Sequence, residues 1–91
     1  MPIEYDPRKA AANLRKHSIS FDEAASSLLD PCALVRHDPD APDEARFVLV
    51  GMSNKARLLT VCYTLRQEDT VRLISGRKST QRERNQYAKR I

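Results

Sequence analysis

The stretch from Arg46 to Lys78, R-F-V-L-V-G-M-S-N-K-A-R-L-L-T-V-C-Y-T-L-R-Q-E-D-T-V-R-L-I-S-G-R-K, decides the fold. It predicts three strands, at 46–52, 57–66 and 70–78, because runs rich in β-branched and aromatic residues alternate with polar turns at 53–56 and 67–69. Strands joined by turns this short pair antiparallel. The middle strand is apolar on both faces and therefore belongs at the centre of the sheet.

The residues before this stretch predict one more strand and two helices. A strand at 33–38 precedes an acidic loop with two prolines at 39–44. One helix, 7–17, begins at Asp6-Pro7, and a second begins at the S-x-x-E pattern of Ser20 and Glu23 and ends before Asp30-Pro31. Residues 3–5 predict a short edge strand.

The residues after it predict a last helix, which starts at 79 or 80 with a T-Q-R-E capping box formed by Thr80 and Glu83. We therefore expect a single α+β domain over residues 1–91. Two N-terminal helices pack on one face of an antiparallel sheet of about four strands plus the edge strand, and a C-terminal helix follows. Only Tyr87, Ala88 and Ile91 give that last helix apolar side chains, so we expect it to pack loosely and to need a partner.

Positive charge is concentrated at the C-terminal end. Between Arg72 and Arg90 there are seven Lys or Arg residues against one acid, Glu83, a local charge of +6, whereas the whole chain carries +4. Segregated positive charge favours a polyanionic partner, most often nucleic acid, because phosphate contacts supply most sequence-independent affinity. The alternative explanation is a solvated helix face.

Several classes of protein are excluded or disfavoured by the composition. A chain of 91 residues forms one domain, and it has neither a membrane-spanning run nor a signal peptide, so we expect a cytoplasmic protein. Cys32 and Cys62 lack metal-ligand spacing, and no phosphate-binding or dinucleotide glycine motif is present. No cofactor or metal is therefore expected.

Two sets of polar residues stand out by their spacing. In the first helix Lys9, Asn13 and Lys16 recur at helical spacing and form one polar stripe, which the wet face of an amphipathic helix explains equally well. In the strand at 70–78, simple alternation divides the side chains into two faces. One face would carry Val71, Leu73, Ser75 and Arg77, and the other Arg72, Ile74, Gly76 and Lys78.

Motifs at both ends resemble the BrnT toxin family, small ribonucleases of bacterial type II toxin–antitoxin systems. They are D-P-x-K-A-x-x-N-x-x-K-H at Asp6–His17, S-F-D-E-A at Ser20–Ala24 and R-L-I-S-G-R-K-S-T-Q-R-E-R-N-Q-Y at Arg72–Tyr87. The resemblance implies a RelE-like fold and translation arrest through RNA cleavage. It also implies a BrnA-type antitoxin in a hetero-oligomer with the toxin, with DNA contacted only through the antitoxin. The chain departs from many members at Tyr5, Ser18 and Gly76, where Trp, Gly and Ala are common.

Metal-free RNA cleavage needs a base, cationic donors for the phosphate and an acid for the leaving oxygen. Arginine binds phosphate through two parallel hydrogen bonds and stays charged, so Arg77 and Arg82 are the first candidates. For proton transfer the candidates are His17, Lys9, Lys16 and Tyr87. The residues expected to bind RNA are Lys78, Asn13, Lys16, Arg72 and Arg84.

We expect the stripe on the first helix to line the same groove as Arg77. His17 has an alternative structural role, as a residue that caps helix carbonyls and packs on the core. The whole chain also has alternative interpretations: a non-catalytic nucleic-acid-binding module, or an adaptor whose last helix docks a partner. No helix-turn-helix layout supports a DNA-binding subunit.

Overall fold

The computed structural model describes residues 2–41, 45–67 and 69–90. Part of the predicted acidic loop, residues 42–44, and the apolar Ile91 lie outside the described residues. The elements are β1 (Ile3–Glu4), α1 (Pro7–His17), α2 (Phe21–Ser27), β2 (Leu34–His37), β3 (Arg46–Met52), β4 (Leu58–Arg66), β5 (Thr70–Lys78) and α3 (Gln81–Arg90). The described helices include none that is long and apolar enough to cross a membrane.

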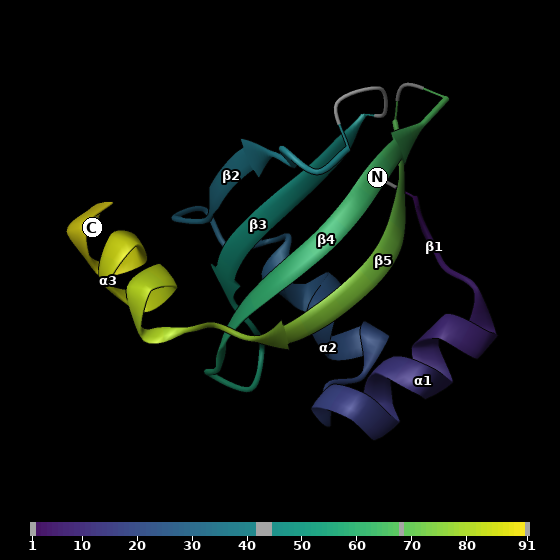
Figure 1. The fold of residues 1–91 in the computed structure, drawn as a ribbon, viewed down its shortest axis with the longest axis horizontal. Coiled ribbons are helices and arrows are strands. Elements are labelled where there is room, and N and C mark those ends of the chain that lie inside the picture. The colour runs from purple at the N-terminus through teal and green to yellow at the C-terminus, as the bar shows by residue number, and fades with distance from the viewer. Residues whose placement is uncertain (1, 42–44, 68, 91) are drawn as a thin grey trace.

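The five strands form one sheet in the order β1-β5-β4-β3-β2 (Figure 1). β2 to β5 form an antiparallel meander, and β4 lies at its centre, as the sequence predicts. β1 pairs parallel to β5, so the sheet is mixed and not antiparallel throughout. The chain reaches this edge directly from the N-terminus, and no hairpin imposes an antiparallel direction.

Capping side chains start the three helices. Asp6 accepts a hydrogen bond from the Arg8 backbone N–H at 2.8 Å, with Pro7 as the first helical residue of α1. Ser20 accepts from the Glu23 N–H at 3.1 Å, but the Glu23 side chain does not complete the predicted box. Glu23 is buried and instead forms an ion pair with Arg57, which lowers its pKa and ties α2 to the turn between β3 and β4.

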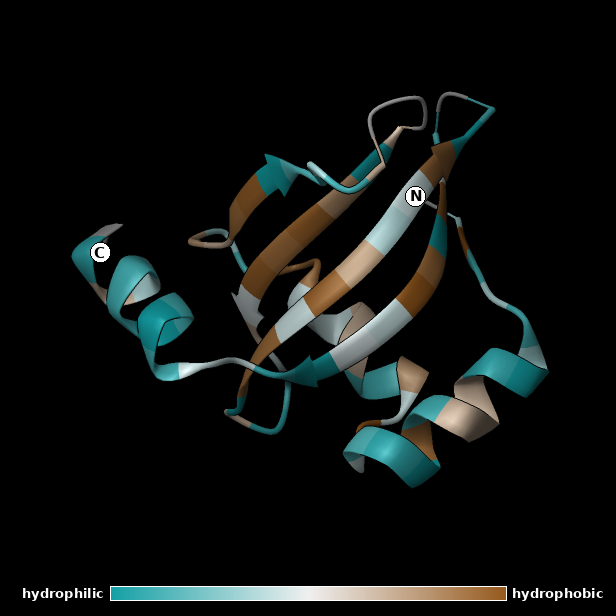
Figure 2. Ribbon diagram, viewed as in Figure 1, coloured by the Kyte–Doolittle hydropathy of each residue, from teal (hydrophilic) through white to brown (hydrophobic). Residues whose placement is uncertain are grey.

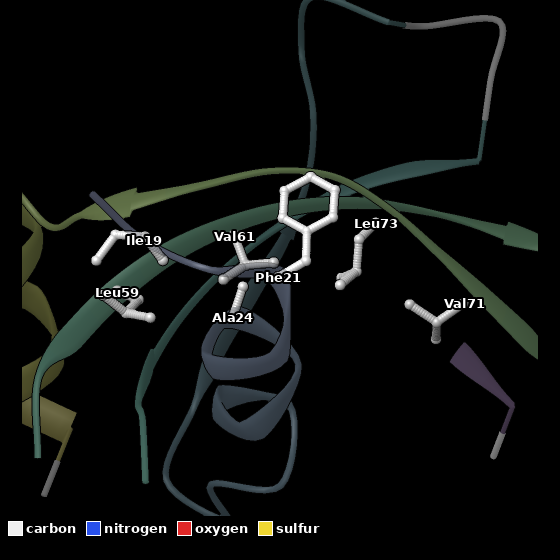
Figure 3. Packing of buried hydrophobic residues seen from close by; sticks show 7 residues of the cluster. All are labelled: Ile19, Phe21, Ala24, Leu59, Val61, Val71 and Leu73. Carbon is white, nitrogen blue, oxygen red and sulfur yellow. The ribbon is translucent and has the colours of Figure 1, made fainter. Parts of the chain in front are cut away.

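The main core lies between α2 and the sheet (Figure 3). Its buried side chains come from the residue Ile19 just before α2, from α2 itself and from β4 and β5: Ile19, Phe21, Ala24, Leu59, Val61, Val71 and Leu73. Figure 2 shows hydrophobic residues along the strands and hydrophilic residues over most of α1 and α3. α1 and α2 therefore cover one face of the sheet, which we call the helix face, and the opposite one is the open face.

One extra residue, Ile74, interrupts the alternation of β5. Cys62 of β4 pairs with Ser75, yet the next β4 residue, Tyr63, pairs with Leu73. Two residues of β5 thus span a single step of β4 beside Ile74, which is the signature of a β-bulge. Beyond the bulge each side chain points to the face opposite to the one that simple alternation predicts.

The bulge determines where Arg77 points. Gly76 faces the helices, because a Cβ built on it would lie 3.0 Å from the Ala24 side chain. The next residue, Arg77, therefore projects from the open face, the face that Arg72 also occupies. The prediction that Arg77 shares a face with Leu73 and that Gly76 lies opposite is wrong, because nothing in the sequence marks the extra residue.

α3 packs on the open face at one end of the sheet. Its buried Tyr87 contacts Val50 and Leu58, with Cys32 and Leu34 beside them. The sequence predicts that the last helix packs loosely. This prediction is wrong, because α3 buries the large aromatic side chain of Tyr87 against the sheet. The rest of the open face, toward the other ends of β4 and β5, is not covered by a described helix (Figure 1).

Candidate functional site

The predicted phosphate ligand Arg77 lies where β5 passes into α3. Its guanidinium forms a two-pronged ion pair with Glu83, with Nη1 to Oε1 at 2.8 Å and Nη2 to Oε2 at 3.0 Å. The side chain remains 40% exposed. The ion pair uses two of the five N–H donors of arginine, so Arg77 can still meet an anion on the open face.

Glu83 also completes the predicted capping box of α3. The Glu83 N–H donates to Thr80 Oγ1 at 3.2 Å, and the Thr80 N–H donates to Glu83 Oε1 at 2.8 Å. Burial disfavours the charged carboxylate, but hydrogen bonds from Arg77, Thr80 and Thr60 outweigh it and lower the pKa of Glu83 to about 2. Glu83 is therefore an anion at neutral pH, and it fixes both the start of α3 and the direction of Arg77.

The open face carries arginines on three of its strands. Cross-strand neighbours share a face, so the pairing defines rows of side chains across it. The rows are Leu34, Val50, Thr60 and Arg77; Arg36, Val48, Cys62 and Ser75; and Arg46, Thr64 and Arg72. Where α3 leaves the face uncovered, Thr64 lies between Arg46 and Arg72, and these two arginines also pair with Asp38 and Glu4, so this part of the face is polar and rich in arginine.

A hollow of about 370 Å³ opens between β2 and α3. It is lined by Arg36, Thr80, Arg82, Glu83 and Gln86. Glu83 thus belongs both to this hollow and to the ion pair with Arg77, which brings the two predicted phosphate ligands, Arg77 and Arg82, to the same junction. We refer to Arg77, Glu83 and the hollow together as the β5–α3 junction.

Lys9, Lys16 and His17 line a different hollow, of about 290 Å³, between α1 and the edge of β5. Ile74 and Ser75 form its other wall. α1 packs beside α2, and the Arg77 side chain leaves the opposite side of β5. The prediction that α1 lines one groove with Arg77 is therefore wrong. Lys9, Lys16 and His17, three of the four candidates for proton transfer, therefore lie apart from Arg77 and Arg82.

Asn13 is buried, although the predicted stripe would expose it. Its Nδ2 donates to the carbonyls of Ile19 at 2.9 Å and Gly76 at 2.8 Å, and its Oδ1 accepts from the Gly76 N–H at 3.1 Å. Both N–H donors of the amide are used inside the fold. We therefore leave Asn13 out of the candidate site and assign it to the attachment of α1.

Tyr87 belongs to α3, and its side chain is buried between this helix and the sheet. Its hydroxyl donates to Asp30 Oδ2 at 2.6 Å. This hydrogen bond to a carboxylate, with burial, raises the pKa of Tyr87 to about 12. The Tyr87 phenol is thus harder to ionise than an ordinary tyrosine, and it holds the helix in place. We leave it out of the catalytic candidates.

The other predicted RNA ligands are dispersed. Arg72 lies on the open face and pairs with Glu4 at 3.6 Å. Lys78 is exposed and follows Arg77, so it points to the side of the helix face, where it pairs in register with Leu59. Arg84 is exposed on α3 and does not line the hollow.

The junction also contains residues that the sequence does not indicate as site residues, among them Arg36 and Glu83. Arg36 reaches it from β2, far from the basic segment, and only the strand order reveals this. Glu83 was recognised as a helix cap, and its position six residues after Arg77 was the available signal. In the described part of the chain, no three His, Cys, Asp or Glu side chains group together as metal ligands, and both cysteines are free thiols.

These features define a small α+β domain that presents arginines at one end of an open sheet face. Residues 5–83 match the family described as "Ribonuclease toxin, BrnT, of type II toxin-antitoxin system". The chain belongs to this BrnT family of ribonuclease toxins, as the motifs indicate, and membership in a type II system implies an antitoxin partner.

A solved structure supports the fold. The crystal structure of the Brucella abortus ribonuclease toxin, BrnT, determined at 1.1 Å, matches with a TM-score of 0.70 at 23% sequence identity. The match covers 89% of this chain and 99% of that one. A comparison with curated proteins gives no match.

Proposed function

We propose that this protein is a metal-independent endoribonuclease with a RelE-like fold, which arrests translation in the cytoplasm by cleaving mRNA. Its partner is a BrnA-type antitoxin, which forms a hetero-oligomer with it, covers α3 and supplies any contact to DNA. Family membership supports the class of activity. The observation that carries the choice of site is that Arg77 and Arg82 meet around Glu83 where β5 passes into α3.

At this junction Arg77 binds the phosphate that reacts. Glu83 holds the guanidinium fork from one side, so Arg77 reaches the substrate already oriented and loses little side-chain entropy on binding. Arg82 supplies a second cation across the carboxylate. Arg77 stabilises the additional negative charge that develops when the 2′-oxygen of RNA attacks phosphorus and the 5′-oxygen leaves, and Arg82 adds positive potential beside it.

The activity is tested with purified protein and a labelled single-stranded RNA. We expect cleavage that persists in EDTA and yields 2′,3′-cyclic phosphate ends. Arg77→Ala should lower the cleavage rate by about 100-fold or more, the range seen when one transition-state donor is lost. Cleavage by Arg77→Ala at the wild-type rate would remove this residue from the site, and a strict requirement for Mg²⁺ would contradict the metal-free route.

Arg77→Ala also removes the partner of Glu83, so a second variant separates chemistry from folding. Arg82→Ala breaks no hydrogen bond of the capping box and should still lower the rate, with an unchanged melting temperature. The matched comparison is His17→Ala in the α1 hollow, which should keep its cleavage rate. Loss of activity in folded His17→Ala with normal activity in Arg82→Ala would move the active site to α1.

One observation favours a second function, that of a non-catalytic RNA or antitoxin binder. Arg77 is ion-paired, and the side chains that line the junction hollow include neither histidine nor tyrosine for proton transfer. Expression in a bacterial host distinguishes the two functions. Growth arrest that the neighbouring antitoxin gene relieves supports the toxin, and normal growth with soluble, RNA-binding protein supports the binder.

A further inference from the structure

The hollow at the β5–α3 junction joins cations from two distant parts of the chain. Arg36 belongs to the edge strand β2, and Arg82 lies in the first turn of α3. Both side chains line one opening together with Gln86 and Thr80. Nothing in the basic C-terminal segment pointed to Arg36, and the motifs that resemble the BrnT family do not contain it.

The charges around the hollow leave it positive. The carboxylate in its wall, Glu83, is already compensated by the two hydrogen bonds from Arg77. Asp38, which follows β2, forms an ion pair with Arg46 at 2.8 Å. After the hydrogen bonds from Asp40 and Arg46, Arg36 also contributes to the lowered pKa of Asp38. Two arginines thus line one opening whose own carboxylate, Glu83, is paired with Arg77, so an anion between Arg36 and Arg82 would meet positive charge from both.

The size and the surroundings of the hollow fit a phosphodiester. Its volume of about 370 Å³ exceeds that of a single water by roughly tenfold, so a phosphate group can enter with its sugar. The first turn of α3 forms one wall, and helix N-termini favour anions. Gln86 adds an amide that can donate to a phosphate or sugar oxygen.

We propose that Arg36 and Arg82 together clamp one phosphodiester of a single-stranded RNA, next to the phosphate that Arg77 holds. This subsite rests on the proposed function and extends it, because it specifies that the RNA strand runs across α3 toward β2. Arg36 is a binding residue here. It adds affinity and fixes the path of the strand, and the reacting phosphate stays with Arg77.

Binding is measured separately from cleavage with a fluorescent RNA whose 2′-hydroxyls are methylated, so that the attacking group is absent. We expect Arg36→Ala and Arg82→Ala each to raise the Kd by about fivefold. Arg36→Lys should restore part of the affinity, because it returns the charge without the fork. The control is Lys55→Ala, an exposed cation in the turn between β3 and β4, which should leave the Kd unchanged.

A double variant tests whether the two arginines share one phosphate. For a shared phosphate, Arg36→Ala combined with Arg82→Ala should weaken binding by less than the product of the single effects. It should also lower the slope of log Kd against log salt by about 0.7, one phosphate on a single strand. Multiplicative effects, or an Arg36→Ala variant that behaves like Lys55→Ala, would overturn the clamp.

The failure of this subsite differs from a failure of the proposed function. If the wild-type protein binds and cleaves RNA but Arg36→Ala matches the control, only the subsite is overturned. If the wild-type protein neither binds nor cleaves any RNA tested, the ribonuclease proposal fails and the subsite fails with it. Melting temperatures of all variants show whether a loss of binding reflects unfolding.

Discussion

Asn13 attaches α1 to the sheet with one amide. β1 pairs with β5 only at Val71 and Arg72, so beyond that point the edge of β5 needs another partner. The Asn13 amide supplies it by pairing with both the N–H and the carbonyl of Gly76. A side chain that the sequence presents as a solvent-facing ligand thus takes the place of a neighbouring strand.

We expect Asn13→Ala to lower the free energy of unfolding by about 2–4 kcal/mol, since it leaves buried backbone groups of Gly76 without partners. Thermal or urea unfolding measures this loss. Lys9→Ala, an exposed change on the same helix, should stay within about 0.5 kcal/mol of the wild type. An Asn13→Ala protein as stable as Lys9→Ala would contradict the structural role.

Ser18 ends α1 in a left-handed conformation, with φ 59° and ψ 28°. Glycine adopts this conformation without the clash that a Cβ causes, and it is common where the chain leaves a helix. We expect Ser18→Gly to raise the free energy of unfolding by about 1 kcal/mol, and the melting temperature by roughly 4–8 °C. The cleavage rate, which depends on the junction, should not change. A lower melting temperature would show that the Ser18 side chain contributes more than its strain costs.

At the scale of elements, α3 is held by contacts at both of its ends. Glu83 binds Arg77 at the start of the helix, and Tyr87 binds Asp30 further along. Before the helix begins, Ser79 and Thr60 share a hydrogen bond of 2.8 Å. The helix is therefore a fixed wall of the junction, and its position depends on a few identifiable side chains.

The ion pair between Arg77 and Glu83 at the start of α3 makes the stability of the folded protein depend on pH in the acidic range. The pKa of Glu83 is about 2 in the folded protein, below its ordinary value of 4.5. The contribution is therefore complete above about pH 4.5 and is lost as the pH falls toward 2. We expect Glu83→Gln to be less stable than the wild type at pH 7, and the gap to close near pH 2. A gap of equal size at both pH values would show that charge plays no part.

The hydrogen bond near the other end has the opposite dependence on pH. The pKa of Tyr87 is raised from 10 to about 12, so its contribution is complete below about pH 10 and declines as the pH rises toward 12. Tyr87→Phe should cost about 1–2 kcal/mol at pH 7 by leaving Asp30 one partner short, yet it should cleave RNA at the wild-type rate. A folded Tyr87→Phe variant without cleavage activity would return the phenol to the catalytic candidates.

Helices and strands followed from the sequence because their signals are local. Asp6-Pro7, Ser20 and Thr80 are side chains that cap the nearest backbone groups, and the meander depends on short turns. The direction of side chains along β5 did not follow, since no local pattern marks Ile74 as the extra residue of a bulge. The bulge puts the Arg77 side chain on the open face and so separates it from Lys9, Lys16 and His17.

At the scale of the molecule, the main core lies on the helix face, whereas the open face carries arginines and a smaller hydrophobic cluster under α3. The core fills the space between the sheet and α1 and α2, while arginines from β2, β3 and β5 surround the open face. The sequence alone shows the positive charge that is concentrated between Arg72 and Arg90. Arg36 and Arg46 join it only through the order of the strands, which no local pattern specifies.

This distribution predicts strong salt dependence for RNA binding. If the arginines of the junction neutralise at least two phosphates, the logarithm of the association constant for single-stranded RNA should fall with the logarithm of the salt concentration, with a slope of about −1.4 or steeper. Anisotropy titrations of the methylated RNA between low and moderate salt measure it. A slope near zero would mean that the arginines do not contact phosphates, whatever the affinity.

The bulge at Ile74 lets β5 hold one residue more than its pairing with β4 requires. Deleting one residue there would restore perfect alternation, and Val71 and Leu73 would remain in the core. The pairs of Cys62 with Ser75 and of Thr60 with Arg77 would be kept, so Arg77 would stay on the open face beside Glu83. A substitution at Ile74 leaves this geometry intact. A homologue that is one residue shorter between Leu73 and Arg77 can therefore present the same arginine without a bulge, whereas a strand of the present length needs the bulge to do so.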